Sequence, residues 1–345
     1  MASPRDKLTP EELAIALSNY DLGIIRSAKD LERGAHGAAK IIVESDRGSY
    51  LLKRRIKGRD DPRHVAFTHA IQHYLLEHNF PLPQLIHTRS GQDALLRIRD
   101  GVYELFEYIP ADDHDHGIIA AYEAGRMLGL FHRLVADFPD DPPEEKGNYH
   151  NAPHVLRSFK TIGEQLVEKR EHPSGDIVGL LRDLRETYKS AAAAVEKFGL
   201  SNWETQIIHA DWHPGNMLFE KGHVVAVLDF DSARLGRRVI DVANGVLQFS
   251  FINGGRDLSK WTDRADELRA RRFLRGYDSL ITLSEAELRT VPFLMQEALI
   301  AQAVGPILRT GAYAGLDAFG FLQVVLRKVR WIAGNAAALH LPDEE

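Results

Sequence analysis

The chain has 345 residues, of which 44% are hydrophobic and 27% are charged, which is typical of a soluble globular protein large enough for two domains. A formal net charge of −6 does not favour nucleic-acid binding, and the lack of cysteine excludes disulfides, thiolate metal sites and cysteine nucleophiles. The 16 histidines show no HExxH pattern, so the sequence does not indicate a zinc enzyme. No apolar run approaches a membrane span, and the first ten residues lack the apolar region of a signal peptide. We therefore expect a cytoplasmic protein with no membrane partner.

The N-terminal stretch LTPEELAIALSNYDLG predicts a helix. Thr9 suits the N-cap, Pro10 suits the first helical position, and Glu12 is placed to close a capping box. The next apolar pieces, Ala39–Val43 and Tyr50–Leu52, flank the turn-rich sequence ESDRGS. This pattern predicts a β-hairpin.

The rest of the first hundred residues is expected to be mostly β. A helical pattern covers Ile71–Leu76, and the sequences ALLRI and VYELFEYI predict two more strands around Arg99–Gly101. The segment Pro110–Gly117, PADDHDHG, then combines a proline, a glycine and an acidic run. We place a domain boundary here, with an N-terminal lobe at 1–109 and a C-terminal lobe at 110–345.

The second half of the chain is mainly helical in pattern. IIAAYEAGRMLGLFHRLVADF has a helical face of apolar or small residues, at positions 118, 121, 122, 125, 128, 129 and 135. Two helices are expected in 153–200, with a break near EHPSGD, and helices again after Val239. Between these helices, the sequences TQIIHADW and MLFEKGHVVAVLDFD have the pattern of β-strands. The expected fold class is α+β, with a small, mostly antiparallel β lobe and a larger, mainly helical lobe.

The sequence IIHADWHPGNMLF carries the strongest chemical signal. His209, Asp211 and Asn216 have the H-x-D-x-x-x-x-N spacing of a kinase catalytic loop. In this pattern Asp211 accepts or aligns the proton of the acceptor hydroxyl, and the amide oxygen of Asn216 binds Mg²⁺. The next strand ends in VVAVLDFD, which places Asp229 where a second metal ligand belongs. The pair of motifs is far more specific than either one alone, since two ordinary polar turns rarely have these spacings.

A nucleotide-binding lysine and loop are expected further upstream. Lys53 ends the strand SYLLK and is placed to reach the α- and β-phosphates of ATP. The loop RGAHGAAK precedes it, in which Gly34 and Gly37 bracket Ala35 and His36. Glycines allow backbone N–H groups to approach phosphate oxygens closely, although two glycines three positions apart also describe many ordinary loops.

The sequence LFEYIP is the expected connection between the lobes. Backbone groups of Glu107 and Ile109 would meet the adenine ring there, and the alternative is a plain strand end.

Three more residues have candidate roles around the catalytic loop. Asp241, twelve positions after Asp229, could support the loop together with His209 by bonding its backbone, or it could simply cap a helix. His132 is expected to be a packing and hydrogen-bonding histidine. Asp231 could contact the metal or only water.

The sequences HADWHPGN, VLDFD and LGLFHRL together resemble the aminoglycoside phosphotransferase and choline kinase superfamily. The opening LTPEEL…YDLG and the following GAHGAAKIIVESDRGSYLLKRR are most similar to its type II homoserine kinase and spore-coat kinase branches. The resemblance implies a bilobal, protein-kinase-like fold that uses ATP and Mg²⁺ to phosphorylate a hydroxyl group. It also implies that Asp211 is the catalytic aspartate, that Asn216 and Asp229 bind metal, and that Lys53 binds the nucleotide.

The chain departs from the protein-kinase pattern where those enzymes are regulated. Protein kinases usually carry an arginine before the catalytic aspartate, which pairs with a phosphorylated activation loop, and this chain has Ala210. Asp231 stands where the DFG motif has glycine, and nine residues separate it from Asp241, too few for a regulated activation segment. The sequence thus indicates an enzyme without phosphorylation gating.

A second departure concerns the partner of Lys53. The following helix, RHVAFTHAIQHYLLEH, has no glutamate in its middle, so His69, Gln72 or Glu77 are the candidate stand-ins.

The sequence leaves the acceptor open. The acidic DDHDHG could attract an amine, as in homoserine, choline or an aminoglycoside, or could be a solvated loop, and Arg157, Arg234 or Arg256 could receive a carboxylate. The leading hypothesis is a phosphotransferase that acts on a small amino acid, amino alcohol, sugar or aminoglycoside. The alternatives are a Ser/Thr protein kinase of the stress-response type and a non-catalytic nucleotide-binding scaffold. The intact set of Asp211, Asn216 and Asp229 argues against the scaffold.

Overall fold

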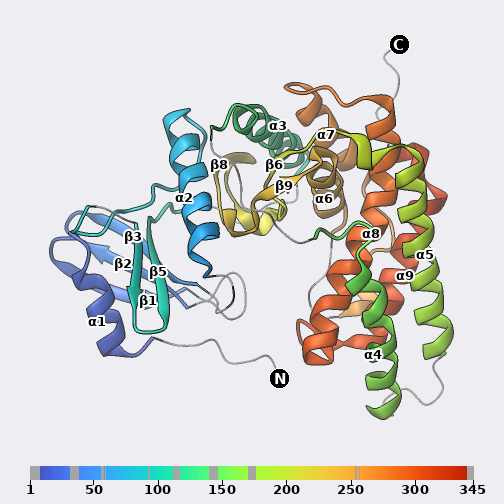
Figure 1. Ribbon diagram of the computed structural model, residues 1–345, viewed down its shortest axis with the longest axis horizontal. Coiled ribbons are helices and arrows are strands. Elements are labelled where there is room, and N and C mark those ends of the chain that lie inside the picture. Colours follow the sequence, from blue (N-terminus) through green and yellow to red (C-terminus); the bar gives the residue numbers. More distant parts are fainter. Residues whose placement is uncertain are drawn as a thin grey trace. The chain divides into compact units, whose positions relative to one another are not determined.

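The computed structural model describes residues 8–31, 39–55, 58, 60–91, 94–111, 117–139, 147–169, 176–252, 255 and 257–339. The chain divides into two compact units (Figure 1). The sheet unit consists of residues 1–113, 137–143 and 215–233, and the helical unit consists of 114–136, 144–214 and 234–345. The sequence suggested one boundary after residue 109, whereas the sheet unit also takes two segments beyond it, 137–143 and 215–233. The roles of the two lobes in binding nucleotide and acceptor stay predictions.

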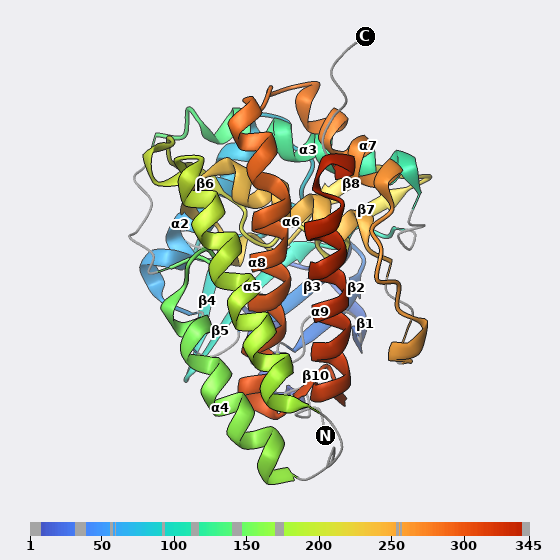
Figure 2. The same ribbon diagram turned by 90° about the vertical axis from the view of Figure 1, so that its right-hand side faces the viewer.

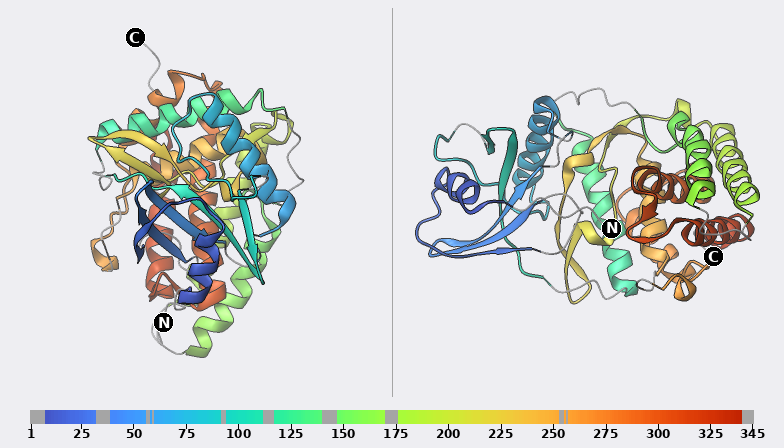
Figure 3. Two further views of the ribbon diagram at one scale, coloured as in Figure 1. Left: turned by 90° about the vertical axis from the view of Figure 1, so that its left-hand side faces the viewer. Right: turned by 90° about the horizontal axis from the view of Figure 1, so that it is seen from below.

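A five-stranded antiparallel sheet forms the sheet unit (Figure 3, left). Its order is β1-β2-β3-β5-β4, with β1 Ile25–Asp30, β2 Lys40–Ser45, β3 Gly48–Arg54, β4 Leu95–Ile98 and β5 Gly101–Glu107. The two predicted hairpins, β2–β3 and β4–β5, are confirmed. The edge strand β1 was not predicted, because its sequence IRSAKD has no apolar alternation and most of its residues are exposed.

Helix α1 (Pro10–Ser18) packs on the sheet through one apolar core. That core consists of Ala16, Leu17, Tyr20, Leu22, Ile41, Val43, Leu52, Leu96, Tyr103 and Leu105. The predicted cap is confirmed at Thr9, whose hydroxyl accepts the N–H of Glu12 at 3.1 Å. The expected return bond differs, because the Glu12 carboxylate accepts a hydrogen bond from the Tyr103 hydroxyl instead.

The strand alternation separates this apolar core from a charged face of the same sheet. Side chains point alternately to the two faces of a strand, so Leu52 and Lys53 point to opposite faces, as do Tyr103 and Glu104. Lys53 and Glu104 are cross-strand partners in the β3–β5 register, which places them side by side. Helix α2 (Pro62–Glu77) contributes His69 to this charged face and is longer than the sequence suggested.

The sheet unit also contains the hairpin of β7 (Met217–Glu220) and β8 (His223–Val227). Lys221 and Gly222 have φ values of 51° and 84°, the left-handed conformation that a tight two-residue hairpin turn requires. A backbone hydrogen bond from the Val227 N–H to the Pro81 carbonyl, at 2.9 Å, connects the hairpin to the rest of the unit.

In the helical unit, α3 (Ile118–Val135) and α6 (Arg238–Ser250) pack on β6 (Gln206–Ile208), which pairs antiparallel with β9 (Arg234–Gly236). Helix α7 (Glu267–Asp278) packs on α3 and α6. Helices α3 and α7 approach each other at glycines. A Cβ atom on Gly125 would lie 2.0 Å from the Phe273 carbonyl oxygen, and one on Gly276 would lie 2.0 Å from that of Tyr122. Larger residues at these two positions would force the helices apart.

A second group of helices in this unit contains α4 (Pro153–Lys169), α5 (Ile177–Lys197), α8 (Glu285–Thr310) and α9 (Ala318–Gly334), with the short β10 (Ala312–Tyr313) and β11 (Leu316–Asp317) between the last two (Figure 2). The predicted break between α4 and α5 is confirmed. By length and hydropathy α8 alone among the described helices could cross a membrane, but 61% of its most apolar stretch is buried, as in the core helix of a bundle. Five 3-10 turns complete the described elements: Leu200–Asn202, Pro214–Asn216, Phe230–Ser232, Leu258–Lys260 and Ala336–Leu339.

Candidate active site

Lys53 lies among three carboxylates of the sheet unit. Its Nζ is 3.0 Å from Oδ1 of Asp229 and 2.8 Å from Oδ2 of Asp231. Burial by itself would lower the pKa of Lys53, but the charges of Asp231, Asp229 and Glu104 raise it above its ordinary value. The lysine is therefore held as a cation next to the segment LDFD that the sequence assigned to metal binding.

Arg55 joins this cluster to the middle of the sheet. Its Nη2 lies 2.8 Å from Oε1 of Glu104 and 2.9 Å from Oδ1 of Asp231, and the Arg55 and Glu104 side chains are 1% and 0% exposed. The same Glu104 oxygen is 2.5 Å from Nε2 of His69. Burial would raise the pKa of the Glu104 carboxyl, but the His69 hydrogen bond and the charges of Arg55 and Lys53 lower it. Glu104 thus stays ionised inside the unit.

This network answers the question of the missing glutamate. The acidic groups beside Lys53 come from strand β5 and the LDFD segment. Two of the α2 residues considered as partners of Lys53 bind other groups. His69 binds Glu104, while Gln72 donates to the Thr68 carbonyl at 3.0 Å. The sequence analysis missed both Arg55 and Glu104. The signal that could have found Glu104 is the hairpin register, since pairing β3 with β5 sets it opposite Lys53.

The β7–β8 hairpin places the two predicted metal ligands at one end. Asn216 and Leu228 are joined by a backbone bond of 2.9 Å just beyond the paired residues Met217 and Val227, so Asn216 and Asp229 flank the open end of the hairpin. Asp229 has φ 60° and ψ 65°, a left-handed conformation that is uncommon for a residue other than glycine. Strain of this kind is found where a side chain must be aimed for function.

The donor set at this hairpin end suits a hard divalent cation. An amide oxygen and a carboxylate are ligands that Mg²⁺ accepts, and Mg²⁺ commonly takes only one or two protein carboxylates, with phosphate and water oxygens completing its shell. Among the described residues no group of three or more His, Asp or Glu is arranged to hold a metal. A cation held by Asn216 and Asp229 would therefore depend on the phosphates of a nucleotide.

In the helical unit, Asp241 organises the backbone of the predicted catalytic loop. Its carboxylate accepts the N–H of His209 at 2.6 Å and the N–H of Ala210 at 2.8 Å, and Nε2 of His132 lies 3.3 Å from the same group. Asp241 is fully buried in α6, whose N-cap, Arg237, makes no side-chain capping bond. Of the two roles considered for Asp241, the structure contains the bonds to the loop.

The loop turns sharply next to Asp211. Ala210 has φ 64°, again in the left-handed region, and its small side chain limits the cost of this conformation. Trp212 is fully buried and donates from Nε1 to the Ala124 carbonyl of α3 at 3.2 Å. The side chain of Asp211, the residue between these two, is 43% exposed. Nε2 of His213 lies 3.5 Å from its Oδ1. His213 had no place in the sequence-based site.

Two parts of the predicted nucleotide site stay predictions: the glycine loop and the adenine contacts. Gly34, Ala35, His36 and Gly37 lie outside the described residues. At the expected adenine position the N–H of Glu107 donates to the Gln84 carbonyl at 2.8 Å, so of the Glu107 backbone only its carbonyl could face a base. The adenine contacts of Glu107 and Ile109 stay predictions.

Comparison with known proteins supplies a family. A sequence profile described as "phosphotransferase enzyme family" matches residues 27–288. A homoserine kinase of Phenylobacterium zucineum is 25% identical over 301 residues, covering 85% of this chain and 83% of that protein. A homoserine kinase of Pseudomonas aeruginosa is 24% identical over 307 residues, covering 87% of each chain.

Solved structures share the fold. An amicoumacin kinase in complex with AMP-PNP, Ca²⁺ and Ami matches with a TM-score of 0.68 and 15% identity, covering 94% of both chains. A microcompartment-associated aminopropanol kinase matches with a TM-score of 0.68 and 17% identity, covering 95% of this chain and 99% of the other. The expected α+β, protein-kinase-like fold is thereby confirmed.

Proposed function

The chain belongs to the phosphotransferase enzyme family, and from that premise we propose that it transfers the γ-phosphate of ATP to the hydroxyl of a small amino acid such as homoserine. It is an ATP-dependent kinase of the small-molecule type that uses a nucleotide and a divalent metal. What the proposal adds is the acceptor, the identity of the metal as Mg²⁺, the residues that act and a cytoplasmic location. The observation that carries the proposed residue roles is the way Asp241 holds the backbone of the loop that bears Asp211.

Asp211 is the proposed base. Its partly exposed carboxylate accepts the proton of the acceptor hydroxyl as that oxygen attacks the γ-phosphorus. The bond from phosphorus to the β–γ bridging oxygen breaks, and ADP leaves with that oxygen. His213, whose Nε2 lies 3.5 Å from Oδ1 of Asp211, orients the carboxylate. No phosphorylated activation segment is needed, because Ala210 leaves no arginine that would require one.

Lys53, Asn216 and Asp229 are the proposed groups for the nucleotide and metal. Lys53 exchanges its contacts with Asp229 and Asp231 for the α- and β-phosphates, which frees Asp229 to act as a ligand. The Arg55 and Glu104 pair keeps Asp231 in place during this exchange. Mg²⁺, when bound by Asn216 and Asp229, would neutralise charge on the β- and γ-phosphates.

The proposed acceptor class rests on Lys328, in a cavity of the helical unit. The cavity, about 50 Å³, is lined by α6, α8, α9 and their connections. The Lys328 ammonium lies 4.9 Å from the ring centre of Phe251 and 5.2 Å from that of Trp261. Aromatic faces like these bind ligand cations such as choline, but here a protein cation already occupies them. A cation in this position favours an acceptor that carries a carboxylate.

Three side-chain amides connect this cavity to the catalytic loop. Gln248, which lines the cavity, donates to Oε1 of Gln302 at 2.8 Å, and Gln302 donates to Oδ1 of Asn244 at 2.7 Å. Asn244 in turn donates to the carbonyl of Trp212, the residue after Asp211, at 3.1 Å. The relay connects the cavity that contains Lys328 to the backbone next to Asp211.

The test is ADP release with Mg²⁺-ATP and a panel of acceptors. The panel holds homoserine, 3-amino-1-propanol, ethanolamine, choline, a sugar, an aminoglycoside and a casein-type protein. We expect the highest kcat/KM with homoserine. A higher value with an amino alcohol would refute the carboxylate argument, and a signal with casein alone would favour the protein-kinase alternative.

Two variants separate the roles. Asp211→Asn is expected to lower kcat by about 10²–10⁴-fold, the usual loss of a general base, while AMP-PNP still binds. Lys328→Met is expected to raise KM for homoserine by about 10-fold or more and to leave KM for 3-amino-1-propanol unchanged. Wild-type turnover by Asp211→Asn would contradict the mechanism, and an equal rise for both acceptors would contradict the role of Lys328.

A further inference from the structure

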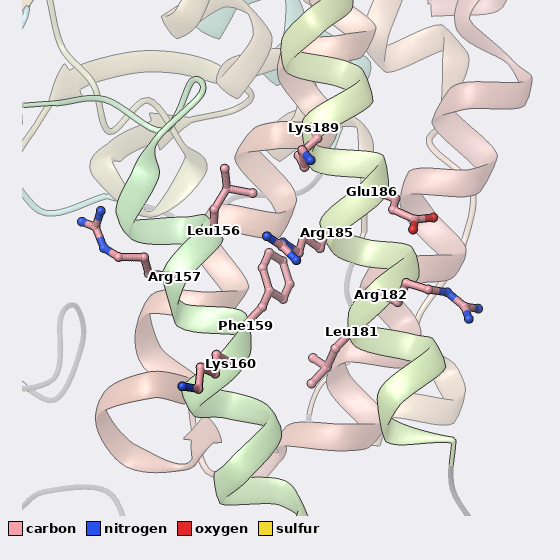
Figure 4. A pocket seen from close by; sticks show the side chains of 9 residues that line it. All are labelled: Leu156, Arg157, Phe159, Lys160, Leu181, Arg182, Arg185, Glu186 and Lys189. Atoms are coloured by element: carbon pink, nitrogen blue, oxygen red, sulfur yellow. The ribbon is translucent and has the colours of Figure 1, made fainter.

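A groove on the helical unit lies between α4 and α5, and none of the residues that line it has a role in the phosphotransfer reaction proposed above. Its volume is about 770 Å³, within the range of ligand sites, and nine residues line it (Figure 4). Leu156, Phe159 and Leu181 form its apolar part and belong to or pack against the core of the bundle. The groove therefore has a firm floor built on buried side chains.

The rest of the lining is strongly basic. Arg157 and Lys160 come from α4, Arg182, Arg185 and Lys189 come from α5, and Glu186 is the one acidic residue among the nine. In Figure 4, Arg185 and Lys189 lie with Phe159 between the two helices, while the other three cations extend along the outer edges. A chain of net charge −6 thus carries a local excess of four positive charges at this groove.

Several arginines on the other helices of the unit form ion pairs. Elsewhere Arg126, Arg269, Arg271, Arg289 and Arg327 each have a carboxylate partner within 4.0 Å. Within the part of the chain that the structure describes, Arg157, Lys160, Arg185 and Lys189 form no ion pair. Arg185 and Lys189 are moreover four positions apart on one helix, where like charges destabilise it. Helix stability gives no reason for this arrangement.

We propose that this groove, defined by Arg157, Phe159, Lys160, Leu181, Arg185 and Lys189, binds an acidic peptide segment of a partner protein. The segment would place carboxylates against the two rows of cations and an apolar side chain over Phe159 and Leu181. The inference is independent of the phosphotransfer reaction proposed above.

The size of the groove favours such a segment over nucleic acid. Residues 182 to 189 span only about 10 Å along α5, enough for a few carboxylates but not for a duplex backbone. The negative charge of the whole chain would also repel an extended polyanion. Exposed apolar side chains on the same helices, Val167 at 58% and Val178 at 74%, add surface that a peptide with apolar residues could cover and a polyphosphate could not.

The probe is a fluorescein-labelled peptide of three Glu-Glu-Leu-Leu repeats, with binding measured by fluorescence anisotropy on the full chain. Arg185→Glu/Lys189→Glu is the test variant, and both side chains are exposed, so the fold is expected to tolerate the change. The matched control is Arg272→Glu/Arg275→Glu, which makes the same charge change at two exposed positions of α7. Circular dichroism verifies that both variants are folded.

We expect the groove variant to weaken binding by at least about 10-fold and the control by less than about 2-fold, because contact pairs outweigh distant charges. A peptide with serine in place of leucine should bind more weakly than the probe. Equal loss in both variants would overturn the proposal, since it would reduce the effect to general charge. So would absence of binding, or tighter binding of duplex DNA or inorganic polyphosphate than of the peptide.

Discussion

Asp241 shows how one buried carboxylate can determine the geometry of the loop that bears Asp211, the proposed base. It accepts two consecutive backbone N–H groups, from His209 and Ala210, and faces His132. A charged acceptor makes stronger bonds than a neutral one and compensates for the left-handed conformation of Ala210. The position of Asp211 therefore depends on a residue 30 positions later in the chain.

We predict that Asp241→Asn destabilises the protein by about 1–3 kcal/mol, because an amide can accept only one of these bonds with full strength and presents N–H groups to others. Urea unfolding followed by circular dichroism measures the loss. Asp278→Asn, at an exposed position of α7, is the control and should change stability by less than about 0.5 kcal/mol. Equal stability of Asp241→Asn and wild type would contradict this account of the loop.

Lys328 makes the stability of the folded protein depend on pH, in a direction that follows from the burial of its ammonium group. Burial lowers the pKa of Lys328 from 10.5 to about 8, with Asp263 opposing the effect in part. Between those two pH values the unfolded chain binds a proton that the folded chain does not, so this residue makes stability rise with pH across that window. Below about pH 8 both states are protonated, and the buried cation costs on the order of 3 kcal/mol.

Lys328→Met should therefore be more stable than wild type at pH 7, by about 1–3 kcal/mol once lost cation–π contacts are counted. The difference should shrink as the pH rises from 8 to 10.5. Urea midpoints across this range measure it, with Lys260→Met, whose side chain is 75% exposed, as the control. If the stability difference between Lys328→Met and wild type stayed constant with pH, the ammonium charge would not be the cause of that difference. A cation retained at such a cost suits a binding role.

At the scale of elements, the β3–β5 pair sets the charges around Lys53, in the proposed nucleotide site. Arg55 and Glu104 are almost fully buried, so removing one partner leaves a charge without compensation. We predict that Arg55→Met destabilises the protein by about 3–5 kcal/mol and that adding Glu104→Gln restores part of the loss. Denaturant unfolding of the single and double variants measures both effects.

The control for this cycle is Arg54→Met, whose side chain is 22% exposed and pairs with Glu12. Arg54→Met should lower the stability by about 1 kcal/mol or less, because partly exposed ion pairs contribute little to it. If the double variant were less stable than Arg55→Met alone, the charge of Glu104 would not be the source of the loss.

The elements also show what the sequence could predict. Hairpins, helices and the spacing of His209, Asp211 and Asn216 are local patterns, so they could be predicted from neighbouring residues. The contact of Lys53 with Asp229 joins positions 176 apart, and no local pattern encodes it. The strand β1 was missed because an exposed edge strand needs no apolar alternation. The three-amide relay from Gln248 to Trp212 was missed because polar residues inside helices carry no periodic signal.

At the scale of the whole molecule, the chain crosses between the two units five times, and each unit contains an apolar cluster. The apolar cluster under α1 lies in the sheet unit, and that of α4, α5, α8 and α9 lies in the helical unit. Chains with several cores often depart from two-state unfolding.

The tryptophans make this separation measurable, because all four, Trp203, Trp212, Trp261 and Trp331, belong to the helical unit. Tryptophan fluorescence thus follows the helical unit, while far-ultraviolet circular dichroism follows the whole chain. In the Arg55→Met variant we expect the dichroism transition to begin at lower urea than in wild type and the fluorescence midpoint to stay within error. If both signals shifted together by the same amount, the units would unfold as one, and the separate cores would not be independent sources of stability.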